Sequence, residues 1–265
     1  MPEVSVSPRA DGEYLWVGTS WKMTKTLGEA RQYASGLAGH LGAAAPAGVQ
    51  PFIIPSFTAL DAVRTELGSG SPVVLGAQNA HWAPAGAWTG EVSVPQVADA
   101  GARLVEIGHS ERREHFGDTD GTVRRKVAAT LEHGLSPLLC IGESEQVKQD
   151  GDSTEYILGQ AAHALDGLSD ADLARVLIAY EPIWAIGEHG RPATVEELVE
   201  PFAALDREFG ATVLGVLYGG SVNLDNAASL LGIEGVSGLF VGRSAWELNG
   251  YLSLLDIASR YAMSH

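Results

Sequence analysis

The stretch Val176-Leu-Ile-Ala-Tyr-Glu181 is a short run of apolar, β-prone residues that ends in a carboxylate. A run of this length and composition is typical of a strand covered on both faces, as strands are in parallel sheets. The same arrangement recurs earlier in the chain, where Leu104–Ile107 precedes His109 and Leu15–Thr19 precedes Lys22. We therefore predict three strands, each with a charged or titratable side chain just beyond its carboxyl end.

Further runs of the same kind complete a regular alternation of strands and helices. The predicted strands are Leu15–Thr19, Phe52–Ile54, Val73–Ala77, Leu104–Ile107, Pro137–Cys140, Val176–Tyr180, Val213–Leu217 and Gly238–Val241. Segments between them, such as Thr122–His133 and Val195–Phe209, have apolar positions at helical spacing. This alternation fits either a closed barrel or a doubly wound open sheet.

The polar groups after the first, fourth and sixth strands favour one of these folds. In a closed barrel the carboxyl ends of all strands meet on one face, where barrel enzymes have their active sites. An open sheet would bring together only the loops near its switch point. We therefore predict an α/β fold, a (β/α)8 barrel, formed as a single domain by residues 1–265.

The composition restricts the partners and the location of the chain. A formal net charge of -16 disfavours nucleic acid and anionic membrane surfaces as partners. No apolar run approaches the roughly 18 residues needed to span a bilayer. The N-terminus lacks the pattern of a signal peptide, and Cys140 is the one cysteine, so an internal disulfide is impossible. We predict a cytoplasmic protein.

A series of motifs is similar, in order and spacing, to those of the triosephosphate isomerase family along nearly the whole chain. The motifs are Val17-Gly-Thr-Ser-Trp-Lys-Met23, Gly76-Ala-Gln-Asn79, Trp88-Thr-Gly-Glu91, Val105-Glu-Ile-Gly-His-Ser-Glu-Arg-Arg113, Cys140-Ile-Gly-Glu143, Ala179-Tyr-Glu-Pro-Ile-Trp-Ala-Ile-Gly187, Tyr218-Gly-Gly-Ser-Val222 and Leu239-Phe-Val-Gly242. The resemblance implies a TIM barrel and an intramolecular oxidoreductase of the aldose–ketose isomerase type. It implies no cofactor, and the chain has no His, Cys and Asp spacing typical of a metal site.

The resemblance assigns catalytic roles to Lys22, His109 and Glu181. Glu181 resembles a general base that moves a proton between adjacent carbons, and its apolar neighbours predict desolvation and a raised pKa. His109 resembles the group that polarises the substrate carbonyl, and a helix beginning just after it would disfavour its charged form. Lys22 resembles a cation that stabilises the developing enediolate. The residues expected to support these three are Ser20, Ser110 and Glu111.

Backbone N–H groups are expected to bind the phosphate of a small phosphorylated sugar. The resemblance places them in the lid after the sixth strand and in the loops after the seventh and eighth strands, where barrels often bind phosphate. The residues concerned are Gly187, Gly220, Ser221, Gly242 and Arg243.

The loop from Asn79 to Thr89 resembles the dimer loop of the family and implies a homodimer. Its tryptophans, Trp82 and Trp88, would be unfavourable on the surface of a monomer.

Three departures from the family pattern fall in the expected pocket. The usual Asn-x-Lys is Ser20-Trp-Lys22, the lid Gly187–Thr194 is one residue longer and contains Pro192, and the usual Gly-Gly after the eighth strand is Gly242-Arg243. A short hydroxyl in place of an amide makes room beside the substrate carbonyl, and a longer lid could close over a larger molecule.

These departures favour a four-carbon ketose phosphate, such as an erythrulose phosphate, as the substrate. The first alternative is triosephosphate isomerase itself, which interconverts dihydroxyacetone phosphate and glyceraldehyde 3-phosphate. A second alternative, from a different functional class, is a non-catalytic sensor of sugar phosphates, and the presence of Lys22, His109 and Glu181 argues against it.

Overall fold

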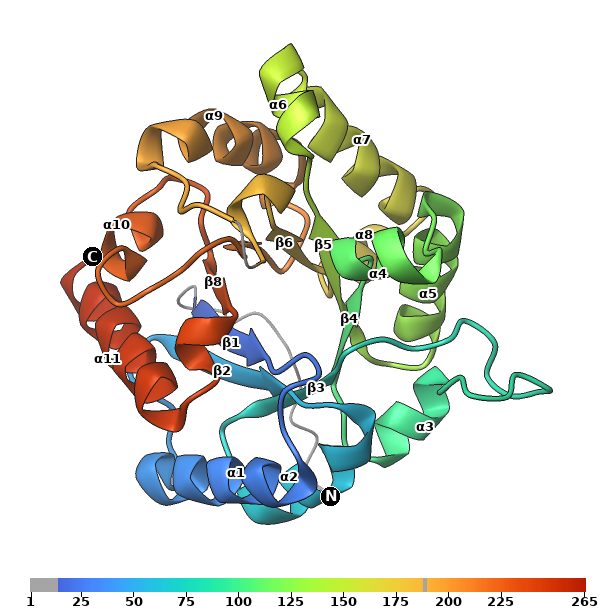
Figure 1. Cartoon of the computed structure of the whole chain (residues 1–265), viewed down its shortest axis with the longest axis vertical. Helices are drawn as coiled ribbons and strands as arrows, with labels where there is room; N and C mark the ends of the chain where they lie inside the picture. Colours follow the sequence, from blue (N-terminus) through green and yellow to red (C-terminus); the bar gives the residue numbers. More distant parts are fainter. Residues whose placement is uncertain (1–13, 188–189) are drawn as a thin grey trace.

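The computed structural model describes residues 14–187 and 190–265. In this part of the chain eight parallel strands close into a barrel, in which each strand pairs with its neighbours in sequence and β8 pairs back with β1 (Figure 1). The strands are β1 (Leu15–Ser20), β2 (Val49–Ile54), β3 (Val74–Ala77), β4 (Leu104–Ile107), β5 (Ser136–Ile141), β6 (Leu177–Tyr180), β7 (Gly215–Tyr218) and β8 (Gly238–Val241). The predicted (β/α)8 barrel is confirmed.

The predicted strand boundaries agree with the structure for β4 and β8 and shift elsewhere. Strand β2 begins at Val49 instead of Phe52, because Gln50 and Pro51 pair with β1 although they interrupt the apolar run. Strand β7 begins at Gly215 instead of Val213, because the amide of Val213 donates to the carbonyl of Phe209 and belongs to the preceding turn. The remaining ends coincide with the predictions or move by a single residue.

Helices surround the barrel on its outer face (Figure 1). The α-helices are α1 (Leu27–Leu41), α2 (Leu60–Leu67), α3 (Val94–Asp99), α4 (Ser110–Phe116), α5 (Asp120–Glu132), α6 (Glu145–Asp150), α7 (Ser153–Leu165), α8 (Asp170–Leu173), α9 (Val195–Leu205), α10 (Ala227–Leu231) and α11 (Leu248–Ser264). Short 3-10 turns are η1 (Phe57–Ala59), η2 (Ile183–Ala185) and η4 (Arg243–Ala245), and η3 (Asp206–Gly210) is a π-turn.

The two helices predicted by residue range form with small changes. The helix expected over Thr122–His133 is α5, which begins earlier because Thr119 caps it and exchanges hydrogen bonds with Thr122. The helix expected over Val195–Phe209 is divided into α9 and the π-turn η3. The divided segment still buries its apolar face, including Phe202 and Phe209.

Alternate strand positions face either the barrel interior or the surrounding helices. The interior cluster contains Trp16, Phe52, Ile54, Val74, Leu104, Leu138, Cys140, Leu177, Ala179, Leu217 and Phe240. Gly18 of β1 leaves space for this cluster, since a Cβ there would lie 2.3 Å from the ring of Phe52. The barrel is thus a packed core, and the space for a ligand lies at the carboxyl ends of its strands.

Among the described residues, none of the helices combines the length and the apolar character needed to cross a lipid bilayer. The same residues contain no group of three or more His, Cys, Asp or Glu side chains placed to hold a metal ion.

Candidate active site

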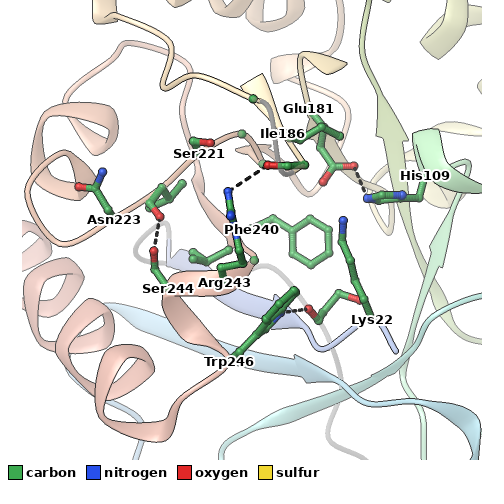
Figure 2. Close-up of a pocket in the computed structure, with 18 of the residues that line it drawn as sticks. Lys22, His109, Glu181, Ile186, Ser221, Asn223, Phe240, Arg243, Ser244 and Trp246 are labelled. Carbon is green, nitrogen blue, oxygen red and sulfur yellow. Dashed lines mark hydrogen bonds and ion pairs between the residues drawn. The ribbon is translucent and has the colours of Figure 1, made fainter. Parts of the chain in front are cut away.

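A cavity of about 660 Å³ lies at the carboxyl ends of the strands (Figure 2). Its volume lies in the range that proteins use for small ligands. Its lining brings together these predicted residues: Ser20, Lys22, His109, Glu111, Glu181, Gly187, Gly220, Ser221, Gly242 and Arg243. Ser110 is the exception, because it lines a separate small void together with Cys140 and Glu181. Of the predicted lid, Glu188 and His189 lie outside the described residues.

Lys22 is held in the cavity by an unusual backbone conformation. Its φ is 48°, a left-handed value that is uncommon outside glycine. The side chain of Gln78 donates a hydrogen bond to the carbonyl of Lys22 at 2.8 Å and fixes this turn. The ammonium lies 2.5 Å from the carboxylate of Glu111. Burial alone would lower the pKa of Lys22, but this hydrogen bond and the nearby carboxylates raise it, so the cation persists at neutral pH.

His109 lies between β4 and α4, as the residue that caps the helix. Its Nδ1 atom accepts a hydrogen bond from the backbone N–H of Glu111 at 3.2 Å. Burial and the positive charge of Lys22 lower the pKa of His109 to about 4. The imidazole is therefore neutral near pH 7, with its proton on Nε2. That atom lies 3.7 Å from Oε2 of Glu181 (Figure 2).

Glu181 follows β6 and is 5% exposed. Its backbone amide donates to the carbonyl of Ile141, which ties it to the end of β5. Its Oε2 atom has no hydrogen-bond partner in the part of the chain that the structure describes. Burial, together with the negative charge of Glu106, raises the pKa of Glu181 to about 8. Such a carboxylate has a high proton affinity and faces a cavity, the two properties that a general base needs.

Glu106 was not predicted as a site residue, yet it also lines the cavity. It is 4% exposed, and its Oε2 atom accepts a hydrogen bond of 2.8 Å from the hydroxyl of Ser20. Burial raises the pKa of Glu106 to about 7, although the Ser20 hydrogen bond opposes the change. The signal in the sequence is a lone carboxylate within the apolar strand Leu104–Ile107.

The opposite end of the cavity is lined by described residues from the loops after β6, β7 and β8. The hydroxyl of Ser221 donates to the carbonyl of Ala185 at 2.7 Å and joins the second loop to the first. The guanidinium of Arg243 donates to the carbonyl of Gly187 at 2.9 Å and joins the third loop to the first (Figure 2). The sequence did not predict Asn223, which also lines this end.

A buried carboxylate supports the segment that precedes the lid. Glu143 is 1% exposed, and its Oε1 atom accepts hydrogen bonds from the indole of Trp184 at 2.7 Å and from the hydroxyl of Tyr180 at 3.2 Å. Its backbone carbonyl accepts from the amide of Ile183 at 2.9 Å. These contacts fix the chain on both sides of Glu181.

Comparison with known proteins gives the family. The sequence model described as triosephosphate isomerase matches residues 15–258. The chain belongs to the triosephosphate isomerase family. Within this family it is 67% identical to a protein of Mycolicibacterium smegmatis named L-erythrulose-1-phosphate isomerase, over 93% of this chain and 94% of that protein.

Two further relatives carry the same name. The Mesorhizobium japonicum protein is 49% identical over 92% of this chain and 97% of its own length. The Rhizobium etli protein is 49% identical over 91% of each chain.

Proposed function

We propose that this protein is an isomerase of L-erythrulose 1-phosphate. The observation that carries the proposal is the buried carboxylate of Glu181, which faces the neutral imidazole of His109 across 3.7 Å inside the cavity. The substrate is taken from the relatives, which bear this name and align over more than nine-tenths of the chain. The four-carbon substrate expected from the departures at Ser20, the lid and Arg243 agrees with these names.

The chemistry follows from the substrate. The carbonyl of L-erythrulose 1-phosphate is at C2, and C1 carries the phosphate ester, so the carbonyl can move only to C3. Glu181 takes the proton from C3, the electron pair forms the C2–C3 double bond, and the carbonyl oxygen receives a proton from Nε2 of His109. The resulting enediol takes a proton at C2 from Glu181, while the C3 hydroxyl returns a proton to His109. One carbon is oxidised and its neighbour reduced.

The electrostatics of the cavity suit this sequence. A neutral imidazole suits the transfer of a proton between two oxygens of similar basicity. An imidazolium is a much stronger acid, so its acidity matches that of the substrate hydroxyl groups less well. The ammonium of Lys22 supplies positive charge in the same cavity and stabilises the oxyanion that develops on the carbonyl. Its ion pair with Glu111 keeps the ammonium oriented.

We assign phosphate binding to the loops at the opposite end of the cavity. The residues concerned are Gly187, Gly220, Ser221, Gly242 and Arg243, all of which line it. The hydrogen bonds from Ser221 and Arg243 support this assignment because they hold the loops close together before any ligand binds. The guanidinium of Arg243 also places a positive charge at this end, in a protein whose net charge is -16.

We further propose a cytoplasmic homodimer. The segment between β3 and α3 projects away from the barrel (Figure 1). It carries Trp88, which is 49% exposed, and the ring of Trp82 stacks on His81 with 4.0 Å between centroids. A projecting aromatic cluster of this kind is typical of a surface that a second copy covers. Sedimentation at micromolar concentration should give a dimer, and a monomer there would contradict this part of the proposal.

The direct test measures kcat/KM for L-erythrulose 1-phosphate and for glyceraldehyde 3-phosphate. The four-carbon substrate should have the higher value, and a large preference for the triose would instead favour a triosephosphate isomerase. Glu181→Gln should lower kcat by roughly 10³-fold, because a general base contributes about this much. A sensor would bind sugar phosphates without exchanging their carbon-bound protons with solvent deuterium.

A further inference from the structure

Glu106 is a carboxylate inside the barrel. The proton-transfer steps proposed above do not include it. It follows Leu104 by two residues on β4, and Leu104 belongs to the interior cluster. Residues two apart on a strand share a face, so Glu106 projects into the barrel just above this cluster. It lies below the position of His109 and lines the floor of the cavity.

The environment of Glu106 leaves it short of hydrogen bonds. An ionised carboxylate has about four acceptor sites. Among the described residues, the hydroxyl of Ser20 is the one group that donates to it, at 2.8 Å. Burial opposes its ionised form, the charges of Lys22 and Arg112 favour it, and the negative charges of Glu111 and Glu181 oppose it. Burying a carboxyl with so few partners is costly, so a ligand that fills the remaining sites has a physical reason to bind there.

The backbone of Ser20 is itself held in place. The carbonyl of Ser20 accepts a hydrogen bond of 2.9 Å from the indole of Trp246 (Figure 2). Trp246 and Phe240 line the cavity beside it. Ser20 and Glu106 therefore form a fixed polar pair on the floor of the cavity. An asparagine at position 20, as in the usual family pattern, would occupy more of this space.

The polar groups of the cavity fall into three zones. The phosphate zone consists of described residues in the loops after β6, β7 and β8, the reacting zone contains Lys22, His109, Glu111 and Glu181, and the floor carries Ser20 and Glu106. In L-erythrulose 1-phosphate, C2 and C3 lie between the phosphate on C1 and the hydroxymethyl group at C4. A molecule that places its phosphate in the first zone and its reacting carbons in the second directs C4 toward the floor.

We propose that Glu106, held by Ser20, binds the C4 hydroxyl of the four-carbon substrate and sets the preference for that substrate over a triose phosphate. The hydroxyl donates to the carboxyl oxygen that Ser20 does not use, and a triose phosphate has no group to reach it. This inference rests on the proposed function. It makes Glu106 a specificity determinant, in addition to the effect of its charge on the pKa of Glu181.

The test compares kcat/KM for two substrates in the wild-type enzyme and in variants of Glu106. The substrates are L-erythrulose 1-phosphate and its 4-deoxy analogue, which lacks only the C4 hydroxyl. The wild-type enzyme should prefer the hydroxylated substrate by about 100-fold in kcat/KM, since a lost hydrogen bond to a buried charged group has an effect of this order. Glu106→Leu should reduce this preference to less than about fivefold, because neither substrate then has a carboxyl to bind. Glu106→Gln should restore part of it.

Two controls separate specificity from general damage. Ser221→Ala, at the phosphate end, should lower kcat/KM for both substrates by the same factor. Ser20→Ala should weaken the preference in the same direction as Glu106→Leu, and it tests the pair if Glu106→Leu does not fold. A purely structural role of Glu106 would reduce both substrates equally in every variant and leave their ratio unchanged, which would overturn the inference.

The wild-type measurement distinguishes the two proposals. If the wild-type enzyme does not isomerise L-erythrulose 1-phosphate, the proposed function is wrong, and the inference about Glu106 is overturned with it. If the wild-type enzyme isomerises this substrate but treats the 4-deoxy analogue equally well, the function stands and only the role of Glu106 is wrong.

Discussion

The backbone N–H of Glu111 donates to Nδ1 of His109 at 3.2 Å, and this one hydrogen bond fixes the tautomer of the imidazole. Because Nδ1 is an acceptor, the proton of the neutral ring is on Nε2, the atom that lies 3.7 Å from Glu181. The carboxylate partners of Lys22 and the turn that gives Lys22 a φ of 48° complete a site that is organised before any substrate binds.

The first prediction concerns this tautomer. Burial and the charge of Lys22 lower the pKa of His109 to about 4, so the ring should stay neutral from pH 5.5 upward, whereas a free histidine titrates near about 6.5. Nitrogen NMR of labelled enzyme should show a protonated Nε2 and an unprotonated Nδ1 throughout this range. A charged ring at pH 6 would contradict the prediction.

The second prediction concerns the pH dependence of catalysis. As the proposed general base, Glu181 must be ionised to accept a proton. Burial raises its pKa to about 8, so kcat/KM should rise with pH from about 6 to about 9. The negative charge of Glu106 contributes to this shift. In Glu106→Gln this charge is absent, so the acid limb of the profile should move to lower pH. The second ionisation of the substrate phosphate lies lower, near about 6, and is the same in both enzymes.

The same pair of carboxyls shows how far the sequence could predict the site. The positions of Lys22, His109 and Glu181 just beyond apolar strands indicated that barrel closure would bring them together, and the family resemblance gave their expected roles. Glu106 was not recognised because it lies within β4. A single polar residue inside a strand is equally compatible with either face, and only the register of the closed barrel places it inside.

The differences in the fold have similar local causes. The start of β2 was missed because Gln50 and Pro51 look like the end of a strand, yet both pair with β1. The end of α9 was missed because the apolar spacing continues to Phe209, although the backbone changes to a π-turn after Leu205. At the start of β2, pairing with a distant strand overrides the local pattern, and that information is absent from the segment itself.

The third prediction is that the ionisation of Glu106 lowers the free energy of unfolding. The pKa of Glu106 is about 7 in the folded protein and near 4.5 in an unfolded chain, so the folded state binds more protons between these values. The contribution of Glu106 to the free energy of unfolding is therefore fully present below about pH 4.5 and is lost as the pH rises through about 7. Glu106→Gln removes this ionisation and should be more stable than wild type at pH 8, by on the order of 3 kcal/mol, with no difference near pH 4.

Thermal unfolding measures this difference directly. For a chain of this size the gain at pH 8 corresponds to a rise in Tm of roughly 5–10 °C. Glu234→Gln is the matched control, because Glu234 is exposed, and it should leave the Tm unchanged at both pH values. A Tm difference for Glu106→Gln that does not depend on pH would refute the electrostatic explanation.

The fourth prediction concerns Gly142, which follows β5 and packs against the backbone of Glu181, the proposed general base. A Cβ at this position would lie 2.0 Å from the carbonyl oxygen of Glu181, a distance that real atoms do not reach. Because Glu181 is tied to Ile141 through its amide, the strain cannot be relieved without moving its side chain. Gly142→Ala should therefore lower kcat/KM by about 100-fold, as expected for a shift of about 1 Å in a catalytic group.

Gly159→Ala is the control for this substitution. Gly159 lies on the exposed side of α7, and a Cβ there has no atom within 4 Å. Because alanine favours a helix over glycine, this variant should gain about 0.5–1 kcal/mol in stability and keep its activity. Gly142→Ala should instead lose about 1–3 kcal/mol, since overpacking destabilises a filled interior. Full activity in Gly142→Ala would mean that Glu181 can move without penalty, and the fixed position assigned to the general base would then be wrong.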